Sequence, residues 1–207
     1  MRSAGIVRIS PYREPVPLLD DADELPLPPR RVLVAGTSGS GKTSLALRVA
    51  AVLGVPHVEI DALYHGPGWT RRPSFVEDVE ALIARPGWVT EWQYDEVRAR
   101  LVAAADLLVW LDLGRPRVIW QVARRTLRRR LRRERLWNGN VEPPLRSVFS
   151  DGEHVVRWAW SSHGTTAVRV AGVLDERPEL PVVRLASHAA ARRWLGGPLT
   201  DAARRRS

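Results

Sequence analysis

The sequence contains no cysteine among its 207 residues. Disulfide bonds and thiolate metal sites are therefore excluded. Apolar runs are short, and none approaches the roughly 18 to 20 residues that a membrane-spanning helix needs, so no membrane contact is expected. The N-terminal segment alternates prolines with acids and lacks the basic and apolar pattern of an export signal. From these absences we expect a cytoplasmic protein.

Lysine is almost as scarce, because Lys42 is the only one and every other basic residue is arginine. The 32 basic residues outnumber the 23 acidic ones, which gives a formal net charge of +9. Such a balance indicates a polyanionic partner, either a nucleic acid or a nucleotide. A lone lysine in an arginine-rich chain indicates a position where a compact ammonium group is needed.

Short apolar runs alternate with helical patterns from residue 31 onward. The runs predict five strands, at residues 32–35, 55–60, 88–92, 107–113 and 182–186. The helical patterns predict helices at residues 43–53 and 75–84, a long helix opened by Pro116 and a short helix through Trp194. This alternation predicts an α/β fold with a doubly wound, parallel, five-stranded sheet. Ligands of such sheets bind beyond the carboxyl ends of the strands.

The predicted domain covers residues 30–196. Residues 1–29 are rich in proline and acids, which predicts a flexible N-terminal extension, with an ordered arm packed on the domain as the alternative. Residues 197–207 are predicted to form a basic C-terminal tail, which is expected to be loose from Arg204 onward.

Residues 36–43 read Gly-Thr-Ser-Gly-Ser-Gly-Lys-Thr and match the phosphate-loop pattern G-x-x-x-x-G-K-[ST]. The glycines let backbone N–H groups converge at a helix N-terminus, where an anion binds. Lys42 is expected to reach the β- and γ-phosphates of ATP, and Thr43 to ligate Mg²⁺. The predicted nucleotide-binding residues are Gly36, Ser38, Gly39, Ser40, Gly41, Lys42, Thr43 and Ser44.

With this loop, the sequence resembles the adenylate-kinase-like branch of the P-loop kinases. It is more closely similar to small bacterial proteins described as DNA topology modulation proteins or AAA-type ATPases. The resemblance covers residues 31–191 and rests on the loop and on the segments at residues 60–64, 67–69, 88–98, 111–113 and 137–140. It implies phosphoryl transfer from MgATP to a small acceptor.

Two acids lie at the ends of predicted strands and are candidates for the chemistry. The resemblance implies that Asp61 contacts the acceptor hydroxyl as an orienting group or base, with capping of the next segment as the alternative. It also implies that Glu91 holds a Mg²⁺-bound water, as an aspartate does in adenylate kinases. A buried ion pair is the alternative for Glu91, and Asp112 is the competing candidate for the metal.

Arginines crowd the long helix predicted after Pro116. The resemblance implies that this region, about residues 115–163, is a lid whose arginines close on the triphosphate. Arg124 and Arg128 lie one turn apart and are expected to contact phosphate, while the other arginines form a solvated face. A basic helix of this kind could equally lie on nucleic acid.

The acceptor is the open question. Adenylate kinases hold the monophosphate of their acceptor with an arginine that comes shortly after the acid equivalent to Glu91. Residues 92–95 of this chain read Trp-Gln-Tyr-Asp at that place and contain no arginine. Arg71, Arg72 or Arg98 could substitute for it, and Trp69 and Trp92 flank the expected acceptor pocket. The leading hypothesis is a kinase acting on a small acceptor, of which a nucleotide is one option. One alternative is an ATP-binding switch or slow ATPase without an acceptor. The other is a nucleic-acid-binding regulator, although nucleic acid is the less favoured partner.

Overall fold

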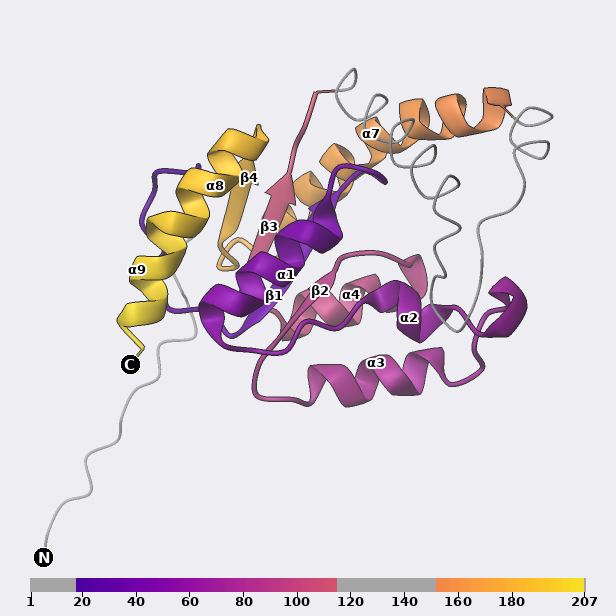
Figure 1. Cartoon of the computed structure of the whole chain (residues 1–207), viewed down its shortest axis with the longest axis horizontal. Coiled ribbons are helices and arrows are strands. Elements are labelled where there is room, and N and C mark those ends of the chain that lie inside the picture. Colours follow the sequence, from indigo (N-terminus) through magenta and orange to yellow (C-terminus); the bar gives the residue numbers. More distant parts are fainter. Residues whose placement is uncertain (1–17, 115–151, 207) are drawn as a thin grey trace, which may run out of the picture.

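The computed structural model describes residues 18–114 and 152–206, with side chains of the second range described from residue 164 onward. The described strands are β1 (Arg31–Gly36), β2 (Trp88–Glu91), β3 (Leu107–Leu111) and β4 (Val182–Leu185). They form one parallel sheet in the spatial order β2-β1-β3-β4, with β1 between β2 and β3 (Figure 1). The predicted α/β fold with a parallel sheet is confirmed.

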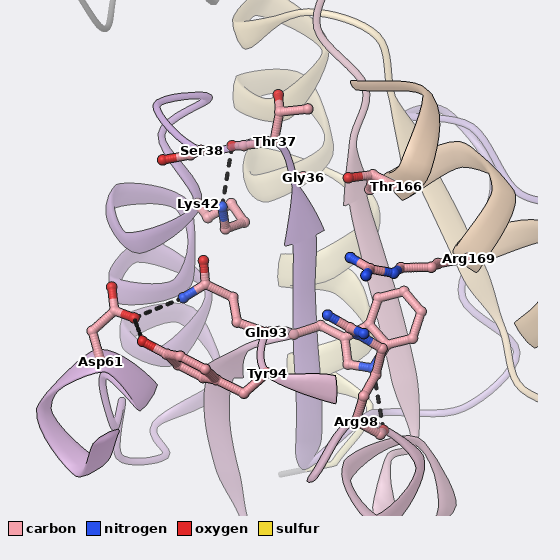
Figure 2. A pocket seen from close by; sticks show the side chains of 11 residues that line it. Gly36, Thr37, Ser38, Lys42, Asp61, Gln93, Tyr94, Arg98, Thr166 and Arg169 are labelled. Carbon is pink, nitrogen blue, oxygen red and sulfur yellow. Dashed lines mark hydrogen bonds between the residues drawn. The ribbon is translucent and has the colours of Figure 1, made fainter. Parts of the chain in front are cut away.

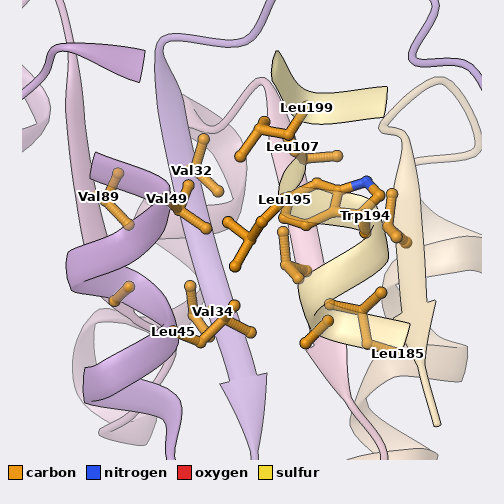
Figure 3. Packing of buried hydrophobic residues seen from close by; sticks show 14 of the residues in the cluster. Val32, Val34, Leu45, Val49, Val89, Leu107, Leu185, Trp194, Leu195 and Leu199 are labelled. Carbon is orange, nitrogen blue, oxygen red and sulfur yellow. The ribbon is translucent and has the colours of Figure 1, made fainter. Parts of the chain in front are cut away.

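One face of the sheet is covered by α1 (Lys42–Leu53), α8 (His188–Gly196) and α9 (Pro198–Arg204). Val32 and Val34 of β1 lie in this layer with Leu45 of α1 and Trp194 of α8, which is completely buried (Figure 3). This layer anchors α1, and with α1 the loop that precedes it, against the centre of the sheet.

The opposite face packs against α3 (Phe75–Ile83), α4 (Asp95–Ala104) and the C-terminal part of α7 (Gly152–Glu176). Leu33 of β1 is fully buried there among Phe75, Leu101 and Val170. Because β1 is covered on both faces, its sequence reads as a continuous apolar run and does not alternate. Helices on both faces make the sheet doubly wound, as predicted.

The prediction of a strand at residues 55–60 is wrong, and the sheet formed by the described residues has four strands. This segment runs beside β2 but forms a single bridge, between His57 and Val89. Pro56 has no N–H to donate, and α2 (Ile60–Tyr64) begins at the last residue of the expected strand. Too few residues remain between them for a ladder. A short 3₁₀ helix, η1 (Pro67–Trp69), follows α2.

Both ends of the domain differ from the expected boundaries. Leu19 donates its N–H to the Val182 carbonyl at 2.8 Å, and its own carbonyl accepts from Arg184 N–H at 2.8 Å, which places it beside β4. Leu25 is 2% exposed. Residues 18–29, expected in a flexible extension, therefore pack on the domain. At the other end α9 occupies most of the expected basic tail and buries Leu199.

The long helix expected after Pro116, with Arg124 and Arg128, lies outside the described residues. Within residues 18–114 and 152–206, no helix has the length and apolar character to cross a membrane.

Candidate active site at the carboxyl edge of the sheet

The phosphate-loop motif connects β1 to α1 at the carboxyl edge of the sheet. Gly36 has a φ of +155°, and a Cβ at this position would lie 2.8 Å from Ser40 Oγ and 3.0 Å from the Leu111 carbonyl oxygen. Gly41, the N-cap residue of α1, has a φ of +96°. A side chain at either position would be strained, and at Gly36 it would also collide with the turn. The glycines thus hold the closed loop that the motif predicts.

The beginning of α1 has the donors that an anion needs. Lys42 is the first residue of the helix, is buried, and donates from Nζ to the Thr37 carbonyl at 3.1 Å. No described side chain caps the helix, and its first turn holds no acid. Ser40 is fully buried, and its Oγ has no hydrogen-bond partner within the described chain. Uncapped N–H groups, a buried hydroxyl and an ammonium group fit a phosphate group at this helix end.

A cavity of about 340 Å³ opens beside the loop (Figure 2). One wall consists of the loop residues Gly36, Thr37, Ser38 and Lys42. The other walls come from α2, the β2–α4 connection, α4 and α7, and consist of Asp61, Trp92, Gln93, Tyr94, Arg98, Thr166 and Arg169. The structure therefore brings Lys42 and Asp61, which the sequence singled out separately, to one cavity. The predicted residues Thr43 and Ser44 follow Lys42 in the first turn of α1.

Asp61 lies in the first turn of α2, and not at the end of a strand as expected. Its Oδ1 accepts hydrogen bonds from Gln93 Nε2 at 2.9 Å and from the Tyr94 hydroxyl at 2.7 Å. Within the described chain, no side chain donates to Oδ2. The carboxylate is therefore held at one oxygen and has the other available for a ligand in the cavity.

Tyr94 is a site residue that the sequence analysis did not identify. Its φ of +59° is unusual for a residue with a side chain, and it directly precedes α4. Burial, reinforced by the hydrogen bond to Asp61, raises the pKa of Tyr94 well above its ordinary value. The phenol therefore stays protonated and donates to the carboxylate. Backbone strain of this kind persists where surrounding contacts hold it, commonly at functional sites.

Glu91 is buried at the end of β2 and does not line the cavity. Its Oε1 lies 3.2 Å from His57 Nε2, and its Oε2 accepts from the Ile60 N–H at 3.2 Å. Burial alone would raise the pKa of Glu91, but the hydrogen bonds from His57 and Ile60 outweigh it and lower the pKa. Both oxygens of the Glu91 carboxylate thus have partners within the protein, outside the lining of the cavity described above.

The remaining candidates for a metal and for the acceptor have partners elsewhere. Asp112 forms an ion pair with Arg184 at 2.7 Å. Arg71 and Arg72 pair with Glu96 and Asp78, at 2.5 Å and 3.0 Å. In the described ranges, no group of three His, Cys, Asp or Glu side chains could hold a metal.

Two arginines line the cavity, Arg98 of α4 and Arg169 of α7. Arg98 was one of three candidates from the sequence, whereas nothing in the sequence singled out Arg169. Of the two tryptophans expected near the acceptor, Trp92 lines the cavity, and Trp69 instead contacts the ring of His65 at 5.2 Å between centroids.

No protein-family model matches the sequence, and no curated protein does either. Among solved structures, a gluconokinase from Sinorhizobium meliloti aligns over 86% of this chain and 96% of its own, with 20% identity and a TM-score of 0.50. A sugar kinase from a Janibacter species aligns over 52% of this chain and 67% of its own, with 21% identity and a TM-score of 0.31. The first likeness, at this identity, shows the fold alone, which this chain shares with that gluconokinase.

Proposed function

We propose that this protein is a phosphotransferase that moves the γ-phosphoryl group of MgATP to a hydroxyl of a small acceptor. The observation that supports this most is that Lys42 of the phosphate loop and Asp61 of α2 line the same cavity (Figure 2). The cavity therefore contains both a group that can bind the donor phosphates and a group that can accept the proton of the acceptor. The kinase fold and the resemblance of the sequence to adenylate-kinase-like proteins support the same assignment.

In this proposal the loop N–H groups and Lys42 hold the β- and γ-phosphates. Thr43 would hold Mg²⁺, which when bound neutralises charge on these phosphates. The acceptor oxygen attacks the γ-phosphorus while the bond to the β–γ bridging oxygen breaks and ADP leaves. Asp61 takes the proton of the hydroxyl at Oδ2, because Oδ1 is held by Gln93 and Tyr94.

The proposal assigns two arginines beyond the described residues, Arg124 and Arg128, to the triphosphate, where they would offset charge in the transition state. It assigns no direct metal contact to Glu91, whose oxygens already accept hydrogen bonds from His57 and Ile60.

The test is ADP release from MgATP, measured alone and with a panel of nucleoside monophosphates, nucleosides, polyols and sugar acids. Gluconate belongs in the panel because one structural neighbour is a gluconokinase. We expect release that depends on one acceptor class and is lost in Lys42→Ala. Asp61→Asn is expected to keep ATP binding and to lower release by roughly a hundredfold or more. Slow release that no acceptor stimulates would instead indicate an ATPase or switch.

A further inference from the structure

Arg98 and Arg169 approach each other on the side of the cavity away from Asp61 (Figure 2). Arg98 is largely buried, with 16% of its side chain exposed, and its Nε has no hydrogen-bond partner within the described residues. Its guanidinium lies over the Trp92 ring, 5.4 Å from the centroid. Two cations from different helices thus face one space, and one of them keeps a buried N–H donor unsatisfied.

Holding the two cations together is costly. Burial, with the nearby charge of Arg169, lowers the pKa of Arg98 to about 10. Arg98 still carries its charge near neutral pH, so the arrangement concentrates positive potential at the cavity wall. An anion bound between the guanidinium groups would relieve this repulsion, and guanidinium geometry suits carboxylate and phosphate groups.

One carboxylate already shows how such an anion would bind. Asp95 Oδ1 contacts Arg98 Nη1 and lies 3.1 Å from Arg169 Nη2. This carboxylate is 76% exposed, so it bridges the arginines from the solvent side. A single oxygen can therefore interact with both guanidinium groups.

A second cavity, of about 500 Å³, lies between α4 and α7 and shares Trp92, Arg98 and Arg169 with the first. The arginines thus stand where the two cavities meet. Space for the body of a ligand exists on either side of them, and the phosphate loop and Asp61 lie in the first cavity only.

We propose that Arg98 and Arg169 form an oxyanion subsite that binds a carboxylate or phosphate group of the acceptor, while its hydroxyl lies toward Asp61 and Lys42. This inference rests on the proposed function and narrows it, because neutral sugars, polyols and nucleosides become poor acceptors. Asp95 is the internal competitor that the acceptor anion displaces or joins.

The test is calorimetric binding of matched pairs that differ in one anionic group: gluconate and glucitol, glucose 6-phosphate and glucose, AMP and adenosine. The phosphate loop is first filled with MgADP, so that the probes do not bind there. We expect the anionic member of at least one pair to bind about tenfold tighter than the neutral member. The pair that responds distinguishes a carboxylate from a phosphate ligand.

Arg98→Met and Arg169→Met should each reduce this preference to about twofold or less. Arg100→Met is the matched control, because Arg100 also lies on α4 but is 53% exposed and pairs with Glu80. Asp95→Asn should have the opposite effect and raise the affinity for the anionic probe roughly severalfold, because the competing carboxylate is removed. A purely structural role of the cluster would instead weaken binding in Asp95→Asn, as in the arginine variants.

The inference is overturned if no anionic probe is preferred, or if Arg100→Met weakens binding as much as Arg98→Met. Its failure is distinguishable from failure of the proposed function. Phosphoryl transfer to neutral acceptors at a rate that Arg98→Met and Arg169→Met leave unchanged would support the kinase assignment and refute the subsite. Arginine-dependent anion binding without transfer to any probe would retain the subsite and remove the kinase assignment.

Discussion

At the scale of single residues, the hydroxyl of Tyr94 orients Asp61. It donates to Oδ1 at 2.7 Å and lies 3.3 Å from His65 Nε2, while its ring stacks on Tyr64 at 4.0 Å between centroids. The stacking and the hydrogen bond belong to different parts of the side chain. Removing the hydroxyl alone therefore separates orientation of the carboxylate from packing of the pocket.

We predict that Tyr94→Phe lowers kcat by about tenfold while the KM for ATP changes by about twofold or less, because only the orientation of Asp61 is lost. Tyr64→Phe is the matched control and should leave kcat close to the wild-type value. Steady-state kinetics with the acceptor found in the ADP-release panel provide the measurement. A Tyr94→Phe enzyme with unchanged kcat would show that Asp61 needs no such support.

Glu91 is a second residue whose role can be tested directly. We predict that Glu91→Gln lowers the free energy of unfolding by about 1–3 kcal/mol near neutral pH, because a buried hydrogen-bonded charge is lost. The folded-state pKa of Glu91 is lowered, so its contribution is present above the unfolded-state pKa and disappears as the pH falls through the folded-state value. The difference between the wild type and the variant should therefore shrink below about pH 4.

Urea unfolding at a series of pH values measures this, with Glu80→Gln as the control. The Glu80 carboxylate is 44% exposed and pairs with Arg100, so its loss should cost about 0.5 kcal/mol or less. The Glu91→Gln variant also tests whether this carboxylate acts on the metal. If folded Glu91→Gln needs about tenfold more Mg²⁺ for turnover, the carboxylate does act on the metal, contrary to the present account.

At the scale of elements, the segment at residues 18–29 belongs to the domain. Leu19 bonds beside β4, and Arg205, after α9, pairs with Glu24 and donates to the Leu25 carbonyl at 2.6 Å. Prolines and acids in this stretch exclude a long helix, but they do not exclude a non-helical chain that buries two leucines, Leu19 and Leu25. The sequence pattern could therefore not separate a flexible extension from a packed strap.

The segment contains a matched pair of leucines for testing this. Leu25 is 2% exposed and Leu27 is 59% exposed. We predict that Leu25→Ala destabilises the protein by about 2–4 kcal/mol, and that Leu27→Ala costs about 0.5 kcal/mol or less. Equilibrium unfolding in urea gives both values. Equal and small effects would mean that residues 18–29 are only loosely attached in solution.

The secondary-structure elements were predicted unequally well. Strands β1 and β3 are long apolar runs buried on both faces, and their sequences are unambiguous. Residues 55–60 read Val-Pro-His-Val-Glu-Ile, so Pro56, His57 and Glu59 interrupt the apolar residues. Pro56 has no N–H to donate to a ladder, and α2 begins at Ile60. These local constraints reduce the segment to one bridge, and apolar content alone does not reveal them.

At the scale of the whole molecule, a parallel sheet gathers groups that are distant in sequence. The closed turn between β1 and α1 could be predicted from the sequence, because the phosphate-loop pattern specifies residue types at fixed spacing. Arg169 could not be predicted, because only the packing of α7 on the sheet places it opposite Arg98. Asp61 lines the same cavity as Lys42, but a helix presents it and not the expected end of a strand.

In the proposed reaction the triphosphate and the acceptor share one cavity, between Lys42 and Asp61. The most direct measurement follows the label of γ-³²P-ATP during a single turnover in the presence of the acceptor panel. We predict that the label appears in a new phosphoester of an anionic acceptor. Lys42→Ala should abolish this product, and Asp61→Asn should slow its formation by roughly a hundredfold or more. Label found only in inorganic phosphate, whichever acceptor is present, would contradict the account.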